Sequence, residues 1–267
     1  MTKTQLESKN FLKTAQIGNS LMTRYLITVE YDGTAYAGWQ RQVGQLSIQE
    51  VLERAWATFF EEKITLRSAG RTDAGVHALA MPAHFDSQKV LTGEKIVNIF
   101  NSALPRDIAV KSAKTVGQDF HARYSAVKKT YRYTIFNSPI KPALNANRVG
   151  HIKKPLDIDA IKAAAKHIVG THDFKAFCAS GSSVVDFYRT IEDLKIMKAG
   201  EYITLEITGN GFLYNMVRII AGTLVYVGLG KIAPNDIPDI IKSGERKRAG
   251  KTLAASGLLL VGVTYCE

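Results

Sequence analysis

The stretch Ser68-Ala-Gly-Arg-Thr-Asp-Ala-Gly-Val-His-Ala78 holds a single carboxylate, Asp73, framed by Gly70 and Gly75. Strand-like sequence lies on both sides of it, so we expect it to form a loop that joins two strands. Such loops expose functional side chains on a rigid base. Asp-x-Gly is also a common turn composition, in which the aspartate only caps its own backbone. These residues alone leave both interpretations open.

The segments around this loop predict the order β-α-β-β-α-β for the first half of the chain. Residues 23–31 alternate as a strand does, and Ser47 to Glu50 has the capping-box pattern of a helix start. The helix that follows is expected to bury apolar residues at helical spacing, as far as Phe59 and Phe60. One face of the first strand is expected to carry Tyr25, Ile27, Val29 and Tyr31. The remaining expected elements are strands at 64–67, 78–86 and 108–115 and a helix at 94–103.

The second half repeats this order. We expect strands at 128–136, 189–197, 202–208 and 258–265, helices at 158–169, 212–226 and 236–242, a linker at Pro139 and Pro142, and a helix cap at Gly170. Two halves of one topology predict an α+β fold of two related lobes, each a mixed, mainly antiparallel sheet with flanking helices, with a cleft between them. We expect lobes at 22–125 and 126–267, preceded by a polar, disordered extension at 1–21.

Composition favours a nucleic-acid partner over a membrane. The net charge of the 267 residues is +11, and a basic field of this kind attracts polyanions. The excess is concentrated in residues 111–132 and 242–251. No uncharged apolar stretch reaches the roughly 18 residues needed to cross a bilayer.

The remaining residues give no pattern of a metal or nucleotide site. The two cysteines, Cys178 and Cys266, form no CxxC pair, which fits a reducing, cytoplasmic compartment. The histidines lack the i, i+4 spacing of a zinc helix, and residues 228–231 lack the spacing of a P-loop. His84 alternates within a predicted strand and is expected to be structural.

Three further segments bear on the chemistry. Arg71 lies two residues from Asp73, and a nearby cation favours an ionised carboxylate. Residues 120–123 and 128–133 interleave aromatic with basic side chains, as surfaces that bind RNA do. Arg218 flanks the apolar stripe of a predicted helix, where it is either a surface arginine or a buried partner for an acid.

Together these segments resemble the TruA family of pseudouridine synthases. The resemblance rests on Gly70-Arg-Thr-Asp-Ala-Gly-Val-His77, Glu30-Tyr-Asp-Gly33, Gly38-Trp-Gln-Arg41, Asp119-Phe-His-Ala-Arg123, Tyr131-Arg-Tyr133, Asn210-Gly-Phe212, Met216-Val-Arg218 and Gly257-Leu-Leu-Leu260. These motifs occur in family order over about residues 23–265. The family isomerises uridine to pseudouridine, which needs one aspartate and neither metal nor cofactor. The resemblance therefore implies that Asp73 is catalytic.

The resemblance also implies roles for four other residues. Arg218 is expected to pair with Asp73, and Tyr131 to stack on the target base. Leu258 is expected to pack near the uracil, and Arg71 to help flip the nucleotide out of its stack. The implied substrate is the anticodon arm of tRNA at positions 38, 39 and 40, bound across a cytoplasmic homodimer, with the basic clusters as phosphate tracks.

Two other functions stay open on the residues alone. A non-catalytic RNA-binding protein would use the same basic and aromatic side chains, although it would not need Asp73. An N-glycosidase would release free base, but that chemistry uses paired carboxylates, and the segment around Asp73 has no second acid.

Overall fold

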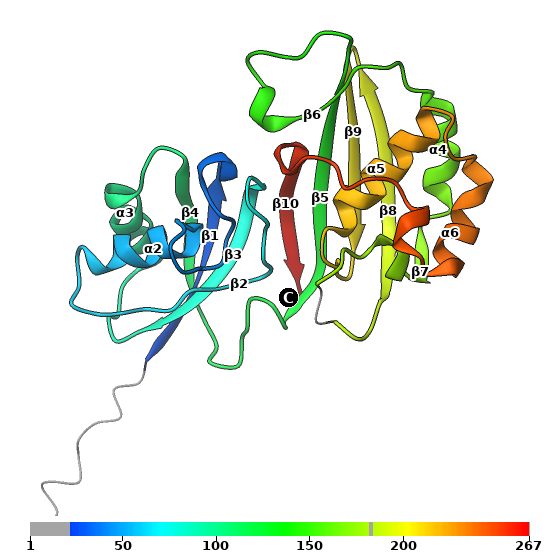
Figure 1. Cartoon of the computed structure of the whole chain (residues 1–267). Coiled ribbons are helices and arrows are strands. Elements are labelled where there is room, and N and C mark those ends of the chain that lie inside the picture. Colours follow the sequence, from blue (N-terminus) through cyan, green and yellow to red (C-terminus); the bar gives the residue numbers. More distant parts are fainter. Residues whose placement is uncertain (1–21, 182–183, 267) are drawn as a thin grey trace, which may run out of the picture.

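The computed structural model describes residues 22–181 and 184–266, so the predicted extension at 1–21 lies outside the described residues. The first half follows the predicted order of elements (Figure 1). They are β1 (Thr23–Tyr31), α2 (Ile48–Ala57), β2 (Arg67–Ser68), β3 (His77–Ser87), α3 (Gly93–Ala103) and β4 (Ile108–Val116). The predicted strand at 64–67 is wrong in extent, because only Arg67 and Ser68 pair with β3.

Local sequence explains where α2 begins and ends. The Ser47 hydroxyl accepts a hydrogen bond from the Glu50 backbone N–H at 3.3 Å, as an N-cap does. The Glu50 carboxylate accepts from Arg54 at 2.6 Å, so the structure shows one hydrogen bond of the capping box. The prediction that Phe59 is buried is wrong: α2 ends at Ala57, and Phe59 lies beyond it with 47% of its surface exposed.

The second half contains more elements than the sequence predicts. They are β5 (Ala126–Asn137), β6 (Gly150–Ile152), α4 (Ile158–Lys166), β7 (Gly170–Asp173), β8 (Tyr188–Ala199), β9 (Tyr202–Gly209), α5 (Met216–Gly228), α6 (Ile237–Ser243) and β10 (Leu258–Tyr265). Gly170 does not cap α4, which ends at Lys166, but opens β7 with φ of +119°. Helix α5 begins at Met216 rather than Phe212, because Asn215 before it has a left-handed backbone.

One sheet runs through both halves, in the order β4-β1-β3-β10-β5-β9-β8-β7, with β2 beside β3 and β6 beside β5. β10 pairs with β3 and β6 pairs with β5 in parallel, whereas the other pairs are antiparallel. The order β4-β1-β3 recurs as β10-β5-β9, which is the internal repeat expected from the sequence. The predicted fold class is confirmed, while the lobe boundary at 125 and 126 stays a prediction.

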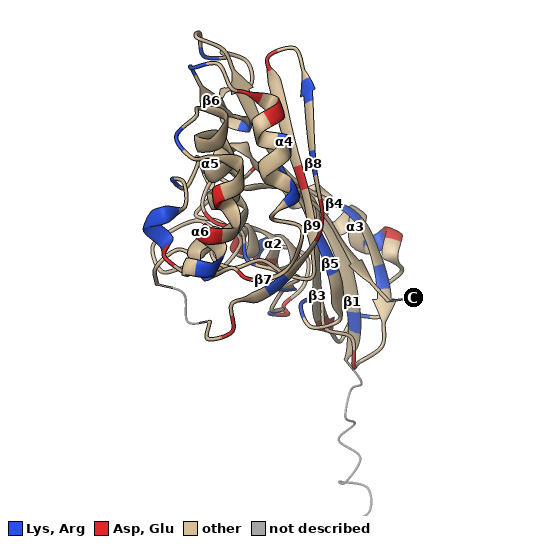
Figure 2. Cartoon of the chain, turned by 90° about the vertical axis from the view of Figure 1, so that its right-hand side faces the viewer, with Lys and Arg blue, Asp and Glu red and all other residues tan. Residues whose placement is uncertain are grey.

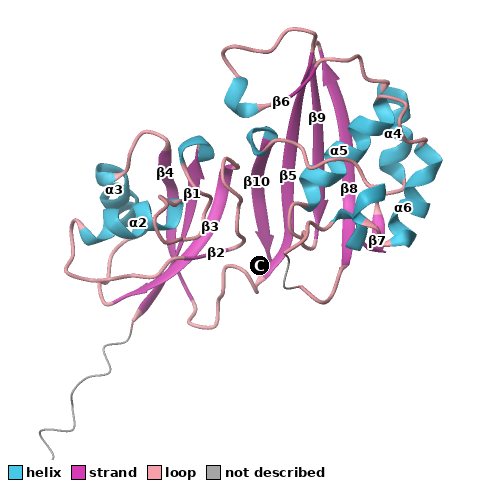
Figure 3. Ribbon diagram, viewed as in Figure 1, coloured by secondary structure: helices cyan, strands magenta, loops and turns pink. Residues whose placement is uncertain are grey.

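The helices cover one side of the strands in the second half. Helices α4, α5 and α6 gather there (Figure 3), and the side chains of Tyr133, Ile203 and Ile207 below them are buried. In the first half the core is aromatic, with Phe85 and Phe100 packed against Trp56, and Tyr25 packed against Phe85. No described helix is long and apolar enough to cross a membrane.

Candidate active site

The loop that carries Asp73 joins β2 to β3 where the two halves of the sheet meet. Trp39 N–H donates to the Thr72 carbonyl at 3.1 Å, and the Thr72 hydroxyl lies 2.8 Å from the Tyr31 hydroxyl. Gly38 is required beside them, since its φ is +93° and an added Cβ would lie 2.3 Å from the Thr72 oxygen. The first half of the chain thus fixes the backbone next to Asp73.

The second half supplies the partner of Asp73. Arg218, in the first turn of α5, donates from Nη1 to Asp73 Oδ2 at 3.1 Å. The arginine side chain is 16% exposed and the aspartate side chain 32%. Within residues 22–181 and 184–266, Asp73 Oδ1 has no hydrogen-bond partner. One carboxylate oxygen is therefore anchored, and the other is available to a ligand.

Two contacts from its own half hold Arg218 in this position. Its Nε donates to the Leu253 carbonyl at 2.8 Å, and Nη1 also donates to Asn215 Oδ1 at 2.6 Å. Asn215 has φ of 59°, the left-handed conformation that asparagine tolerates better than most residues. This turn ends the preceding loop and aims the first turn of α5 at Asp73.

Apolar and aromatic side chains form a wall of the cleft. Tyr131 on β5 is buried, and its ring lies 5.2 Å from that of Phe212 at an angle of 84°. Burial, together with the charge of Asp73, raises the pKa of the Tyr131 hydroxyl, which therefore stays protonated. Leu258, at the start of β10, is also buried and lines the same space.

Cations also line the cleft. Arg71 and Arg123 are exposed, and among the described residues neither guanidinium has a hydrogen bond or ion pair, although that of Arg123 stacks on Tyr124. Lys129 Nζ donates to the Ala69 carbonyl at 2.7 Å. The cleft therefore combines an anchored carboxylate, an aromatic wall and a positively charged side.

The cleft has a volume of about 530 Å³. Cavities of this size accommodate ligands as large as a nucleoside. Among the described residues, its lining contains one carboxylate, that of Asp73. The lining residues are Gly70, Arg71, Thr72, Asp73, Val76, Arg123, Lys129, Tyr131, Gly181, Val184, Phe212, Leu213, Tyr214, Asn215, Met216, Val217 and Leu258.

All five residues expected at the site lie at this cleft. Arg71, Asp73, Tyr131 and Leu258 line it, and Arg218 reaches it through its contact with Asp73. No individual role was predicted from the sequence for Phe212 or Asn215, and Lys129 was counted only as part of a basic segment. An asparagine early in a predicted helix and a lysine two residues before Tyr131 were visible in the sequence, but neither shows which side chains converge.

The histidines near the site have structural contacts. His84 is buried, and its Nδ1 accepts from Ala122 N–H at 3.1 Å, as expected of a structural histidine. His77 Nε2 lies 2.8 Å from the Asn147 carbonyl, which only accepts, so Nδ1 is the acceptor for Gly33 N–H at 3.1 Å. Among the described residues, no group of three or more His, Cys, Asp or Glu side chains could hold a metal ion.

Comparison with known proteins agrees with this geometry. The model of the family described as tRNA pseudouridine synthase matches residues 27–125 and 164–266. Proteins named tRNA pseudouridine synthase A are 48% identical in Thermoanaerobacter sp. (strain X514) and 46% identical in Acetivibrio thermocellus, each over 91% of this chain and 100% of the relative. A third, from Pelobacter propionicus, is 45% identical over 90% of this chain and 98% of its own. This chain therefore belongs to the tRNA pseudouridine synthase family.

Proposed function

We propose that this chain isomerises uridine to pseudouridine in tRNA and that Asp73 is its one catalytic carboxylate. In this reaction the bond between N1 of uracil and C1′ of ribose breaks, and C5 bonds to C1′. The hydrogen at C5 leaves as a proton and N1 gains one, so no other reactant is needed. The observation that carries the proposal is the Asp73 carboxylate, anchored through Oδ2 with Oδ1 open to the cleft.

We infer that Oδ1 of Asp73 acts on the substrate, because Arg218 holds Oδ2 and leaves Oδ1 open to the cleft. It can attack C1′, add to C6 of the base or remove a sugar proton, and each of these steps requires the ionised carboxylate. Arg218 serves as a positioning residue, because it holds Oδ2 and thereby fixes the direction of Oδ1. A carboxylate held in place in this way loses little orientational freedom when the substrate binds.

The other expected residues fit the binding of a flipped uridine. The Tyr131 ring offers a flat apolar surface, and its protonated hydroxyl can donate a hydrogen bond. Leu258 adds an apolar contact for the uracil. Arg71, exposed beside the cleft, is placed to contact the strand from which the nucleotide leaves, a step that costs a few kcal/mol.

The names of the relatives supply the substrate class, tRNA. We extend this to the anticodon arm, with positions 38, 39 and 40 as targets, and to a cytoplasmic homodimer that binds the tRNA across both subunits. The net charge of +11 supports a polyanionic substrate. An N-glycosidase is disfavoured, because the described lining of the cleft contains one carboxylate rather than a pair.

Tritium release from tRNA labelled at C5 of uridine tests this proposal directly, since the new bond to C5 expels that hydrogen. We expect release by the wild type and a loss of at least about a thousandfold in Asp73→Asn. Asp86→Asn is the matched control, because Asp86 also pairs with an arginine, Arg24, but does not line the cleft. It should retain turnover within about tenfold of the wild type.

The outcomes separate the alternatives. Release by Asp73→Asn at the wild-type rate would remove Asp73 from the reaction. Tight tRNA binding by the wild type without tritium release would favour a non-catalytic RNA-binding protein. Free uracil in the products would identify an N-glycosidase.

A further inference from the structure

The two faces of β5 differ in how their cations are neutralised. Lys128 contacts Glu192 at 2.5 Å and Arg132 contacts Glu206 at 2.8 Å. Successive residues of a strand point to opposite faces, so Lys129 lies on the other face together with Tyr131, and both line the cleft. Among the described residues, Lys129 has no carboxylate within ion-pair distance. On β5, the cations of one face are thus paired with carboxylates, whereas in the described chain Lys129 on the cleft face is not.

The Lys129 ammonium lies directly beneath the loop that carries Arg71 and Asp73. It donates to the Ala69 carbonyl at 2.7 Å, and a Cβ added to Gly70 would lie 3.4 Å from Nζ. An ammonium has three donors, and this bond uses one of them. Its other donors have no partner in the described part of the chain and can reach a ligand in the cleft.

The charged groups that act on the pKa of Lys129 are two arginines, Arg123 from the loop between β4 and β5 and Arg189 on β8. The residues opposite it in β9 and β10 are Gly209 and Val263, which carry no charge. The nearest acid of the cleft lining, Asp73, is engaged by Arg218. Burial and these two arginines lower the pKa of Lys129 to about 8.

We propose that Lys129 and Arg123 together bind a backbone phosphate of the RNA next to the uridine held at Asp73. The inference rests on the proposed function, which places a uridine there, and it names two residues that position the substrate. A phosphodiester accepts hydrogen bonds through two unesterified oxygens, which suits an ammonium and a guanidinium that converge without an acid. Asp73 would then contact the reacting uridine, while Lys129 and Arg123 contact the phosphate next to it.

The proposal has a consequence for pH dependence. An anionic phosphate stabilises the charged form of Lys129, so the RNA binds the protonated protein more tightly. Affinity should therefore be highest below pH 8 and decrease as pH rises through the pKa of about 8. If only the protonated form makes the contact, affinity falls about tenfold between pH 7 and pH 9.

Binding of tRNA to the full-length chain tests this, with Asp73→Asn as the background so that the RNA is not altered. In this background, Lys129→Met should lower the slope of log affinity against log salt by about 0.9, the value of one phosphate contact, and abolish the decrease above pH 8. Lys129→Arg should keep most of the affinity and make it independent of pH, because arginine stays charged. Lys195→Met, whose lysine on β8 is paired with Asp193 and lies outside both basic clusters and the cleft lining, should leave both slopes unchanged.

Thermal unfolding shows whether each variant is folded. If Lys129→Met does not fold, Lys129→Gln takes its place. Unchanged salt and pH slopes in folded Lys129→Met or Lys129→Gln would overturn the phosphate contact, even if the wild type makes pseudouridine. If Lys129→Met lowers the salt slope but the wild type makes no pseudouridine, the phosphate contact stands and the proposed isomerase activity is rejected.

Discussion

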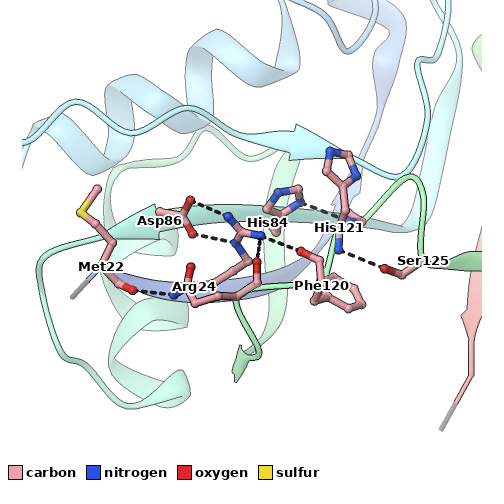
Figure 4. A network of polar contacts seen from close by, with 9 residues as sticks. Met22, Arg24, His84, Asp86, Phe120, His121 and Ser125 are labelled. Carbon is pink, nitrogen blue, oxygen red and sulfur yellow. Dashed lines mark hydrogen bonds and ion pairs between the residues drawn. The ribbon is translucent and has the colours of Figure 1, made fainter.

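Two arginine–aspartate pairs in this chain are alike in burial but differ in geometry. In the pair Arg218–Asp73 the side chains are 16% and 32% exposed, and in the pair Arg24–Asp86 they are 18% and 33% exposed. Arg24 binds both carboxylate oxygens of Asp86, at 2.7 and 2.8 Å (Figure 4). Arg218 binds one oxygen of Asp73, at 3.1 Å. Within the part of the chain that the structure describes, Asp73 therefore keeps one carboxylate oxygen without a partner, whereas both oxygens of Asp86 are engaged.

The surroundings of Arg24 explain what the saturated pair does. Its Nη1 donates to the carbonyls of Gln118 and Phe120, at 2.5 and 2.9 Å, and so ties residues 118–120 to β1 and β3. His84 fixes the same loop through Ala122 N–H. This loop continues to Arg123 at the cleft. The difference teaches that a shared pairing motif becomes structural when the arginine engages both carboxylate oxygens and becomes available for chemistry when one oxygen is left without a partner.

Of the two arginines, Arg218 should give the larger effect, because Arg218→Met leaves Asp73 without its anchor. We expect turnover of tRNA to fall at least about a hundredfold, because a misdirected carboxylate loses the alignment it needs. The measurement is single-turnover tritium release at saturating tRNA. Arg24→Met is the matched control and should lower the free energy of unfolding while changing single-turnover release less than about tenfold. Equal losses of turnover in both variants would erase the distinction between the pairs.

The next effect concerns His84, which lies beside the saturated pair. Burial, then the charges of His121, Arg24 and Arg67, lower its pKa to about 4, against a smaller opposing effect of Asp86. A histidine whose folded pKa lies below its unfolded value near 6.5 stabilises the protein least in acid. The free energy of unfolding should therefore drop by about 2–3 kcal/mol as pH falls from 7.5 to 4.5.

His84→Asn tests this cause, because asparagine can offer Oδ1 to Ala122 N–H without gaining a proton. Urea titrations across the same pH range should show a flatter profile for the variant. If the wild type and His84→Asn lose stability in parallel, other groups cause the acid sensitivity, and His84 contributes only its hydrogen bond.

Asp86→Asn should have a smaller effect on stability, about 1–2 kcal/mol at neutral pH, through loss of the charge-assisted contacts to Arg24. The hydrogen bond from Arg24 is the main favourable cause of the lowered pKa of Asp86. A lowered pKa means that this stability is present above the unfolded value near 4 and is lost as pH falls below it. The difference between wild type and variant in urea titrations should thus shrink from pH 6 to pH 3. A difference that stays constant with pH would mean that the charge of Asp86 does not stabilise the fold.

The sequence predicted the strands better than the convergence of the site. Alternation marked β1 and β10 to within a residue, since one face of each strand packs on the core. The start of α5 was missed by four residues, because apolar spacing continues through Phe212 and Leu213 although the backbone turns at Asn215. Periodicity reports burial and does not report a left-handed residue.

The family resemblance predicted which residues form the site, but it did not give the distances between them. Nothing local to Asp73 or Arg218 shows that residues 145 positions apart form a hydrogen bond. The contact depends on β10 returning between β3 and β5, which joins the halves. The bidentate pair Arg24–Asp86 was not foreseen either, because both residues lie within ordinary strand patterns. Long-range pairing of this kind follows from topology, which one sequence specifies only indirectly.

The smallest effect should come from cations that belong to neither pair. Lys247 and Arg248 lie in a short helix at 246–248, beside α6 and entirely basic (Figure 2). Lys247 is highly exposed and its 3.5 Å contact with Glu245 is loose, so both side chains can exchange solvent ions for phosphates. Replacing both with Ala should weaken tRNA binding about two- to fivefold near 0.15 M salt and reduce the salt slope by up to about 1.8. Turnover at saturating tRNA should stay unchanged, because neither residue lines the cleft. An unchanged salt slope would place the phosphate track elsewhere on the surface, whereas a fall in saturated turnover would show that charges beyond the cleft help to orient Asp73 and its substrate.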